Sequence, residues 1–580
     1  DRGVVGGVGV LRQRLAHAGQ PSHGVRVPPG GNRDAPDMWP THRRTSVERM
    51  SADDATTPWS GYAPVQAWDE AMDVEGAGRE PYTRVYAEIA RMSGDDLHSR
   101  AEALANSYLA QGVTFDHAGE ERPFPLDLVP RVIGADEWDI ISPGIGQRVR
   151  TLEAFLADVY GSQHCVTDGL VPRSLLASSP NYLRTVAGLE PPNGVRAHVS
   201  GIDLVRDQHG IWRVLEDNVR VPSGVSYVLS NRRAMSQMFP EMFGAMGIRP
   251  VLEYSQRLRH SLEKCAPEGV DDPTIVVLTP GVFNSAYYEH SLLARTMGVE
   301  LVEGRDLETV NGRVYMRTTA GRRREDVIYR RVDDGYLDPV QFRPDSVLGA
   351  PGMVNAARLG NVTIANAMGN GIADDKLVYT YMPELTRYYL GEEPILPNVD
   401  TWRLEEPEAR EEVMDRLDEL VVKPVDGAGG KGVLIGPKAS TQELDQARTS
   451  ILEDPRGWIA QPVIQLSTVP TLTDDGLEPR HVDLRPFAIN DGDDVWVLPG
   501  GLSRVALGKG QLIVNSSQGG GSKDTWVLGG ARQWRRHQGW EGGCRGRKGP
   551  HRRRRCRPPS ARARCAGQWW VGQGGRPPWR

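Results

Sequence analysis

A glycine-rich loop flanked by lysines is the stretch whose chemistry is plainest. Residues 421–436 read Val-Val-Lys-Pro-Val-Asp-Gly-Ala-Gly-Gly-Lys-Gly-Val-Leu-Ile-Gly, with β-branched runs on either side of the loop. Glycine has no Cβ, so backbone N–H groups in such a loop can approach an anion closely. Lys423 and Lys431 place positive charge beside those groups. The stretch therefore predicts a strand–loop–strand hairpin that binds a nucleoside triphosphate.

Other glycine-loop motifs fit this stretch less well. Gly427, Gly429 and Gly432 satisfy GxGxxG, but that motif opens a helix, and the run 433–437 is short and ends at a proline. A Walker loop needs Ser or Thr after its Gly-Lys pair, and Gly432 stands there. A kinase loop precedes its lysine and needs HRD and DFG motifs, which do not follow here. The alternative to a lysine-led nucleotide loop is a glycine-rich surface hairpin.

Carboxylates and an amide gather on an earlier predicted hairpin. Asp203 lies on its first strand, Glu216 and Asn218 lie on its second, and residues 207–210 form the turn. Because Glu216 and Asn218 are two apart, they share one face of the strand, whereas Asp217 faces the other way. Two carboxylates and an amide oxygen suit Mg²⁺. The alternative is a polar hairpin edge with solvated charges.

Three further stretches carry groups suited to a nucleotide. Lys376 lies in the first turn of a predicted helix capped by Asp374 or Asp375, where the macrodipole disfavours a cation and a phosphate partner would resolve the conflict. The strand 458–463 stops at a proline and leaves backbone groups free to contact an adenine edge. The loop 516–523, which begins at Ser516 and Ser517 and ends at Lys523, is rich in glycine and serine. It fits an anion, and equally a plain flexible loop.

Arginines lie at the ends of predicted strands. Arg330 and Arg331 follow the strand that begins at residue 326, where they fit either a phosphate or carboxylate ligand or a surface ion-pair cluster. Arg485 and Arg504 lie on strands near the C-terminus of the folded part and are expected to face the phosphate-transfer centre.

The elements around these residues indicate a mixed α/β protein. Helical spacing covers 82–92, 95–109 and 138–160, so the chain opens with helices. Residues 274–304 alternate strand, helix and strand, which predicts a small parallel sheet.

Charge and cysteine content exclude several classes of protein. The net charge is −6, but residues 51–530 carry 46 basic and 70 acidic side chains, which argues against general nucleic-acid binding. Of the five cysteines, only Cys165 and Cys265 precede the basic tail, so no disulfide framework or zinc site is expected. No apolar run is long enough to span a membrane and no signal peptide is evident, so a cytoplasmic location is expected.

Taken together, several motifs in order resemble the circularly permuted ATP-grasp family, in its glutathionylspermidine-synthetase-like group, type 2. They are Asp203, the run 216–218, the run 374–376, Lys423 with its glycine loop, the run 483–485 and the loop 516–524. The resemblance covers about residues 60–528. In ordinary ATP-grasp enzymes the Glu-x-Asn pair comes after the lysine and the glycine loop, whereas here it precedes them, as permutation implies.

The resemblance implies a set of ligand-binding residues. Asp203, Glu216 and Asn218 would hold Mg²⁺. ATP would be bound by Lys376, Lys423, Gly427, Gly429, Gly430, Lys431, Gly432, Gln461 and Arg485, with Gln461 near the adenine. By their own place in the sequence, Arg331 at a strand end and Ser516, Ser517 and Lys523 in the anion-friendly loop are expected to bind substrate.

One departure from the family concerns a catalytic arginine. Glutathionylspermidine synthetases carry an arginine two residues before the metal aspartate, and Gly201 occupies that position here. Arg206, Arg330 and Arg504 are the candidates to replace it. The amidase domain of those enzymes is not evident, so glutathione chemistry is not expected.

These residues predict a circularly permuted ATP-grasp fold with a small parallel-sheet domain and a helical N-terminal region. The expected segments are a disordered extension (1–58), a mainly helical region (59–198), the metal hairpin (199–265), a small α/β domain (270–345), the lysine and glycine-loop part (346–528) and a basic tail (529–580). The tail reads as non-native, or alternatively as a segment that binds anionic surfaces.

The resemblance further implies an ATP- and Mg²⁺-dependent carboxylate–amine ligase that acts through an acyl phosphate on small-molecule or peptide substrates. The alternative is a nucleotide-binding or scaffold protein that keeps the fold without turnover.

Overall fold

The computed structural model describes residues 58–117, 120–427, 432–511, 514 and 520–530. All of them fall within one compact unit, which the chain forms up to Gly530. The expected N-terminal extension, apart from Pro58, and the expected tail beyond Gly530 lie outside the described residues.

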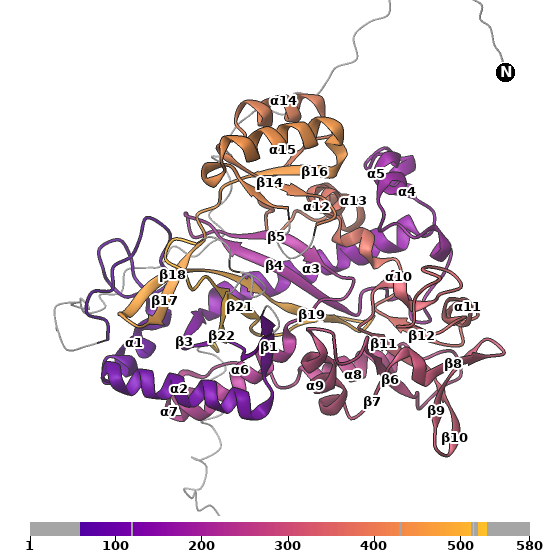
Figure 1. Ribbon diagram of the computed structural model, residues 1–580, viewed down its shortest axis with the longest axis horizontal. Helices are drawn as coiled ribbons and strands as arrows, with labels where there is room; N and C mark the ends of the chain where they lie inside the picture. The colour runs from indigo at the N-terminus through magenta and orange to yellow at the C-terminus, as the bar shows by residue number, and fades with distance from the viewer. Residues whose placement is uncertain (1–57, 118–119, 428–431, 512–513, 515–519, 531–580) are drawn as a thin grey trace, which may run out of the picture. The chain divides into compact units, whose positions relative to one another are not determined.

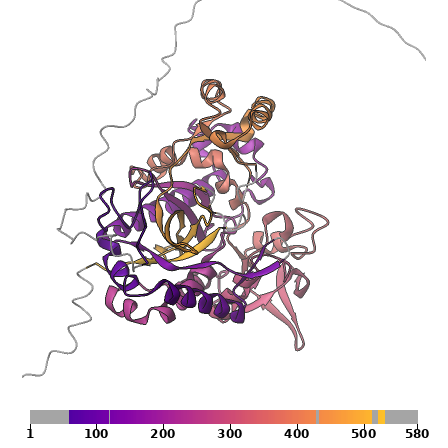
Figure 2. The same ribbon diagram turned by 60° about the vertical axis from the view of Figure 1, so that its left-hand side comes forward.

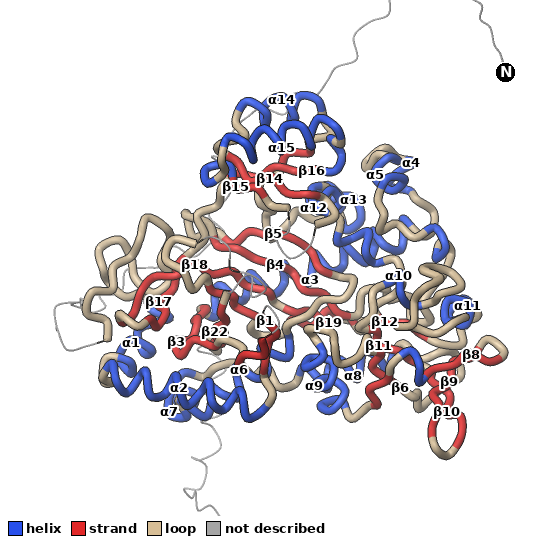
Figure 3. Tube along the Cα trace, in the orientation of Figure 1, coloured by secondary structure: helices blue, strands red, loops and turns tan. Residues whose placement is uncertain are grey.

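A large, mostly antiparallel sheet forms the centre of the described unit (Figures 1 and 3). Its strand order is β20-β19-β4-β18-β21-β22-β3, with β5 paired to β4 and β17 paired to β18. The strands are β3 (Leu126–Ile133), β4 (Val199–Arg206), β5 (Trp212–Asn218), β17 (Thr468–Thr473), β18 (Gly476–Arg485), β19 (Phe487–Asn490), β20 (Val495–Val497), β21 (Leu502–Val505) and β22 (Gly521–Val527). The sheet thus joins stretches of chain that are far apart in sequence.

The region expected to be mainly helical contributes a strand to this sheet. β3 pairs in parallel with β22 and is the last strand in the sheet order. It contains Pro130 and directly follows Pro125, and proline, which lacks an N–H group, is tolerated chiefly at sheet edges. Those prolines hid the strand in the sequence, so the expectation for 59–198 has to be corrected at this point.

Helices cover this sheet. Below it in Figure 1 lie α2 and α6, and α3 packs against β19 and β20. Buried Trp138, Ile141, Ile145, Val149 and Leu152 recur along α3 at helical spacing, which explains why this segment forms an amphipathic helix. These helices are α1 (Thr83–Ile89), α2 (Gly94–Gln111), α3 (Ala135–Val159), α6 (Val225–Met238), α7 (Pro240–Met246) and α8 (Tyr254–Lys264).

The expected βαβ unit is present beside the large sheet. β6 (Ile275–Leu278), α9 (Tyr287–Met297) and β7 (Glu300–Val302) belong to a parallel sheet of order β12-β11-β6-β7. β11 spans Val327–Arg330 and β12 spans Thr363–Ala365. An antiparallel sheet formed by β8 (Leu307–Val310), β9 (Arg313–Thr318) and β10 (Gly321–Glu325) extends from it (Figures 1 and 2).

The glycine hairpin belongs to a separate sheet of four strands. Its order is β13-β16-β14-β15, and α14 and α15 cover one face (Figure 1). A separate core forms there from Leu404, Val413, Leu417, Leu420, Val422, Ile451 and Ala460. The elements are β13 (Trp402–Arg403), β14 (Leu420–Pro424), β15 (Leu434–Ile435), β16 (Trp458–Pro462), α14 (Pro407–Asp415) and α15 (Thr441–Glu453).

The remaining elements connect the sheets. They are β1 (Thr114–His117), β2 (Glu120–Pro123), α4 (His164–Thr167), α5 (Arg173–Ser178), α10 (Asp334–Leu337), α11 (Met353–Arg358), α12 (Lys376–Thr380) and α13 (Met382–Leu390). Among the helices of the described residues, none combines the length and apolar character needed to cross a bilayer.

Candidate active site

A cavity of about 400 Å³ opens between the central sheet and the glycine-hairpin sheet. Part of its wall is apolar and is formed by Val421, Val433, Ile435, Val463, Ile464 and Leu466. Nine of the expected site residues also line it: Asp203, Glu216, Asn218, Lys376, Lys423, Gly427, Gln461, Arg485 and Arg504. The fold therefore assembles in one place residues that come from six strands, one helix and one loop.

Asp203 is the most heavily paired carboxylate of the cavity. Its oxygens accept hydrogen bonds from Arg485 Nε, from Arg485 Nη2 at 2.7 Å and from Arg504 Nη2 at 2.7 Å. Burial by itself would raise the pKa of Asp203, but the two guanidinium charges outweigh it and hold that pKa well below its usual range. Asp203 is therefore ionised and bound to arginines, which leaves little of it free for a metal ion.

Arg504 also binds a second aspartate. Its Nε donates to both oxygens of Asp483, at 2.9 and 3.0 Å. Burial raises the pKa of Asp483 despite these bonds. Two arginines and two aspartates thus form one buried cluster under the cavity.

Glu216 and Asn218 fit a hard cation better than Asp203 does. On β5 they share a face, as the alternation predicts, and β4 places Asp203 opposite Glu216 and Gly201 opposite Asn218. Among the described residues, Arg485 Nη2 forms the ion pair with Glu216, at 3.7 Å, and the buried Asn218 Nδ2 has no hydrogen-bond partner there. Burial and then the charge of Asp203 raise the pKa of Glu216, so a cation beside it would be favourable. A carboxylate and an amide oxygen facing a cavity suit Mg²⁺, which usually completes its shell with phosphates and water.

Few of the described side chains besides Glu216 and Asn218 are placed to complete a Mg²⁺ site. Among the described residues, no group of three or more His, Cys, Asp and Glu side chains is placed to hold a metal ion.

Two lysines, Lys376 and Lys423, line the cavity. Lys423 Nζ donates to Gln461 Oε1 at 2.6 Å, and Gln461 Nε2 in turn donates to Thr401. Lys376 Nζ donates to the carbonyl oxygen of Gly427 in the loop after β14. Burial, opposed by Glu216 and reinforced by the charge of Lys376, lowers the pKa of Lys423 to about 8. Two cations with few anionic partners are suited to a polyanion such as a triphosphate.

The helix that carries Lys376 begins where the sequence indicates. The carboxylate of Asp375 accepts a hydrogen bond from Leu377 N at 2.9 Å and so caps α12. Lys376 is the first residue of that helix and lines the cavity, and within the described part of the chain its ammonium group meets no carboxylate at hydrogen-bond distance.

Gly201 makes room for Arg485. A Cβ at residue 201 would lie 3.2 Å from Pro222 Cβ and 3.3 Å from Arg485 Cδ. The space next to Gly201 is filled by the stem of Arg485, which reaches over from β18. An arginine at residue 201 would displace it, so here the guanidinium beside Asp203 comes from a neighbouring strand.

Four expected site residues lie away from this cavity. Arg206 donates to Glu137 at 2.5 Å and to the Gly210 carbonyl. Arg330 is buried against the carbonyl oxygens of Asn366 and Ala367 and against Asp334. The other two are Arg331, which pairs with Glu289 at 2.8 Å, and Lys523, which pairs with Asp127. As placed here they hold the fold together and do not face a ligand.

The remaining expected residues belong to the two glycine-rich stretches of the sequence. Gly429, Gly430, Lys431, Ser516 and Ser517 lie outside the described residues. Gly432 is described and has φ +75°, a conformation that favours glycine, but it does not line the cavity.

Three cavity residues were not predicted to bind a ligand, although Asp374 was considered as a helix cap. Asn181, Arg220 and Asp374 line the cavity near the end of β5. Arg220 is two residues beyond Asn218, so the strand alternation that selected Glu216 and Asn218 could have pointed to it.

Comparison with known proteins settles the family. Residues 130–506 match the model of circularly permuted ATP-grasp proteins, type 2. The chain belongs to this family. An uncharacterized protein of Mycobacterium leprae (strain TN) is 59% identical over 462 residues, which cover 80% of this chain and 82% of that protein. An uncharacterized protein of Synechocystis is 51% identical over 476 residues, covering 81% and 99%.

Two further likenesses are more distant. A protein of Frankia alni that is provisionally named a glutamate–cysteine ligase is 45% identical over 483 residues, which cover 82% of this chain but 56% of that protein. The structure is similar to that of a glutathione synthetase-like effector of Globodera pallida, with a TM-score of 0.48 and 11% identity over 75% of this chain and 98% of that one. The match to the ATP-grasp family supports an ATP-dependent ligase at the level of the family.

Proposed function

We propose that this circularly permuted ATP-grasp protein is a Mg²⁺-dependent ligase that joins a carboxylate to an amine at the cost of ATP. The observation that carries the proposal is the pairing of Lys376 and Lys423 in one cavity with Glu216 and Asn218. Positively charged side chains that suit phosphates then lie beside oxygen ligands that suit Mg²⁺. Phosphoryl transfer requires this arrangement. The substrates are small molecules or peptides that carry the two reacting groups.

Each group of residues has a role in this proposal. Lys376 and Lys423 bind the phosphates, and the apolar wall around Val421 and Ile435 takes the adenine beside Gln461. Glu216 and Asn218 hold Mg²⁺, which supplies charge neutralisation on the phosphates. Arg485 and Arg504, anchored by Asp203, stabilise negative charge that develops on the transferred phosphoryl group. The phosphorylated carboxylate is then open to attack by the amine.

A thermal-unfolding titration with Mg²⁺ and ATP tests nucleotide binding. A ligand at a hundred times its dissociation constant adds about 2.7 kcal/mol to the free energy of unfolding. We expect a magnesium-dependent shift in the wild type that is lost in Lys423→Ala and in Glu216→Gln. Lys438→Ala is the matched control, because Lys438 is exposed at the end of the short 3-10 helix Gly436–Lys438 that follows β15 and does not line the cavity. A folded wild type with no shift would contradict the proposal.

Turnover is tested separately, with hydroxylamine in place of the amine. Candidate carboxylic acids are incubated with protein, Mg²⁺, ATP and hydroxylamine, and the hydroxamate and ADP are measured. An acyl phosphate yields equal amounts of the two. ADP without hydroxamate would instead indicate a phosphotransferase or a hydrolase.

One observation favours a second candidate, a nucleotide-binding protein without turnover. Asp203, expected among the Mg²⁺ ligands, is occupied by Arg485 and Arg504. For that candidate the thermal shift persists, while no acid in the screen releases ADP.

A further inference from the structure

Gln461 links Lys423 to a threonine outside the cavity. Its side chain accepts a hydrogen bond from Lys423 Nζ at 2.6 Å through Oε1 and donates one from Nε2 to Thr401 Oγ1 at 2.9 Å. Only 2% of Gln461 is exposed, so water has little access to its amide. Lys423 and Gln461 line the cavity, whereas Thr401 is not among its lining residues. Thr401 therefore acts on the cavity through Gln461.

The single proton of the Thr401 hydroxyl decides which way the Gln461 amide points. Thr401 Oγ1 donates that proton to the carbonyl oxygen of Val399 at 2.8 Å. Toward Gln461 the hydroxyl thus offers lone pairs alone, which accept from an N–H group. The amide nitrogen of Gln461 must face Thr401, and its carbonyl oxygen must face Lys423. The reverse orientation would set an N–H group against the ammonium group and leave both donors without an acceptor.

The carbonyl that takes this proton is held by the hairpin of the candidate Mg²⁺ ligands. The peptide N–H of Val399 donates to Val214 O at 3.0 Å. Val214 lies on β5, two residues before Glu216. In Figure 1, β14 and β16 lie above β5. A run of hydrogen bonds thus leads from β5 through Thr401 to the ammonium group of Lys423 in the neighbouring sheet.

A carbonyl oxygen is a suitable partner for a lysine that binds phosphate. It favours the charged form of the amine, because a hydrogen bond from a charged donor is stronger than one from a neutral donor. Unlike a carboxylate, it does not cancel the positive charge. Burial already lowers the pKa of Lys423 to about 8. The surrounding charges are those of Glu216 and Asp203, which oppose that change, and of Lys376, which reinforces it. Loss of the carbonyl partner should lower this pKa further.

We propose that Thr401 is a positioning residue of the nucleotide site, which turns the Gln461 amide so that its carbonyl oxygen holds the ammonium group of Lys423 toward the phosphates. This role rests on the proposed function, because it assumes that Lys423 binds nucleotide. Thr401 itself touches no ligand. It lies between α13 and β13, in a stretch with no nucleotide-binding motif of its own.

The apparent affinity for Mg²⁺ and ATP tests this role in thermal-unfolding titrations of the full chain. Thr401→Val keeps the shape of the side chain but removes the acceptor, so the affinity should fall about tenfold. Thr401→Ala, which cannot overpack, should show the same fall, and Thr401→Ser, which keeps the hydroxyl, should restore wild-type affinity. Gln461→Met removes the amide, so adding Thr401→Val to it should cause no further loss.

Thr471→Val is the matched control. Thr471 Oγ1 donates to Val469 O at 3.2 Å, so it makes the same bond to the carbonyl two residues before it. Thr471 lies on β17 and is not among the residues that line the cavity. This variant should leave the nucleotide affinity unchanged, whatever it does to stability.

Chemical labelling reports on Lys423 in the absence of nucleotide. Acetic anhydride reacts with the neutral form of an amine, so the yield at Lys423 relative to the exposed Lys438, followed by mass spectrometry across pH, has its midpoint at the pKa of Lys423. The midpoint does not depend on how accessible the lysine is. Thr401→Val should move it to lower pH, whereas Thr401→Ser and Thr471→Val should leave it in place. A threonine with a purely structural role would not move it.

Three results would overturn the role of Thr401. The first is an unchanged affinity or an unchanged midpoint in Thr401→Val. The second is a loss in Thr401→Ser as large as that in Thr401→Val, because the hydroxyl would then not be responsible. The third is a further loss in the double variant, which would place the effect of Thr401 outside Gln461. If the wild type binds no nucleotide, the proposed function fails, and the labelling midpoint still decides whether Thr401 acts on Lys423.

Discussion

Lys423 and Lys523 both lie inside the described unit, but the groups that surround their side chains differ. Lys523 is fully buried and donates to the Asp127 carboxylate, to Val129 O at 3.1 Å and to Pro470 O at 2.9 Å. Lys423 is only partly buried, and its one recorded acceptor is the neutral Gln461. Burial lowers the pKa of both, but only Lys523 has a carboxylate in contact that opposes the change.

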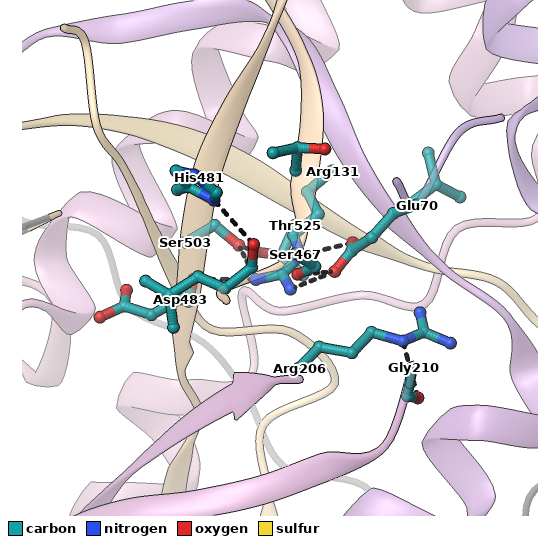
Figure 4. A network of polar contacts seen from close by, with 12 residues as sticks. Glu70, Arg131, Arg206, Gly210, Ser467, His481, Asp483, Ser503 and Thr525 are labelled. Carbon is teal, nitrogen blue, oxygen red and sulfur yellow. Dashed lines mark hydrogen bonds and ion pairs between the residues drawn. The ribbon is translucent and has the colours of Figure 1, made fainter. Parts of the chain in front are cut away.

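The same contrast separates two arginine clusters. Figure 4 shows the guanidinium of Arg131 directed at Glu70, while the side chain of Asp483 points away from it. Arg131 binds Glu70 at 2.6 and 2.9 Å and also donates to the Asp483 carbonyl, and Ser467 completes the Glu70 carboxylate. Arg485 instead faces a cavity. Closed charge clusters hold strands together, whereas charges left open beside a cavity are available to a ligand.

The largest expected effect is the loss of Lys523. Lys523→Met leaves Asp127 buried without its partner, which costs about 3–5 kcal/mol of unfolding free energy. Urea unfolding measures this loss. Lys264→Met is the control with no resolved change, because it removes a lysine that is only partly buried and pairs with Asp491 and Asp493 near the surface. If Lys523→Met were as stable as the wild type, there would be no difference between a lysine enclosed by a carboxylate, such as Lys523, and a lysine open to the cavity, such as Lys423. The double variant with Asp127→Leu should recover part of the loss.

The second effect concerns ligand binding. Lys423→Met should remove the stabilisation by saturating Mg²⁺ and ATP, about 2.7 kcal/mol at a hundred times the dissociation constant, and should not lower the stability of the free protein. The reason is that the free protein gains little from a buried cation with a neutral partner. Paired titrations of Lys423→Met and Lys438→Met check it. A large loss of stability without nucleotide would place Lys423 with the structural lysines.

A smaller effect follows from the tight packing at Gly201. Gly201→Ala adds a Cβ at 3.2–3.3 Å from Pro222 and Arg485, and such overpacking costs about 1–3 kcal/mol. Because the Arg485 stem must move, apparent affinity for Mg²⁺ and ATP should fall as well. Urea unfolding and the nucleotide titration are compared with Gly146→Ala, whose added Cβ meets nothing within 4 Å and lies inside α3. Unchanged nucleotide affinity would mean that Arg485 does not serve the cavity.

The smallest effect is a pH dependence on the order of 1 kcal/mol. The folded-state pKa of Lys423 is about 8, below its ordinary value of 10.5, so between those values the unfolded chain binds more protons. Stability therefore rises with pH across that window relative to Lys423→Met, and the burial penalty is fully present below pH 8. Nucleotide affinity changes the other way and falls above about pH 8, since neutral lysine no longer attracts phosphate. Titrations at about pH 7 and about pH 9 measure both.

Local sequence patterns predicted many residues of the candidate site. Strand alternation placed Glu216 and Asn218 on one face, and the helix start at Asp375 placed Lys376 at a helix N-terminus. The βαβ unit and the strands on either side of the glycine loop followed from apolar periodicity. Each of these depends on neighbours in the chain, which is why sequence suffices.

Tertiary structure alone decided which charges face the cavity. Arg504 and Arg485 line it, while Arg206, Arg330, Arg331 and Lys523, alike in sequence, are enclosed by carboxylates and carbonyl oxygens. Likewise, Gly201 reads as a lost arginine in the sequence, but its neighbour Arg485 lies on another strand. Composition and spacing determined that this protein has a lysine-led glycine hairpin and an oxygen-rich hairpin. A charged side chain is either enclosed by its partners or left open to the cavity, and which of the two occurs depends on residues hundreds of positions away. Only the packed sheet brings those residues within hydrogen-bond distance.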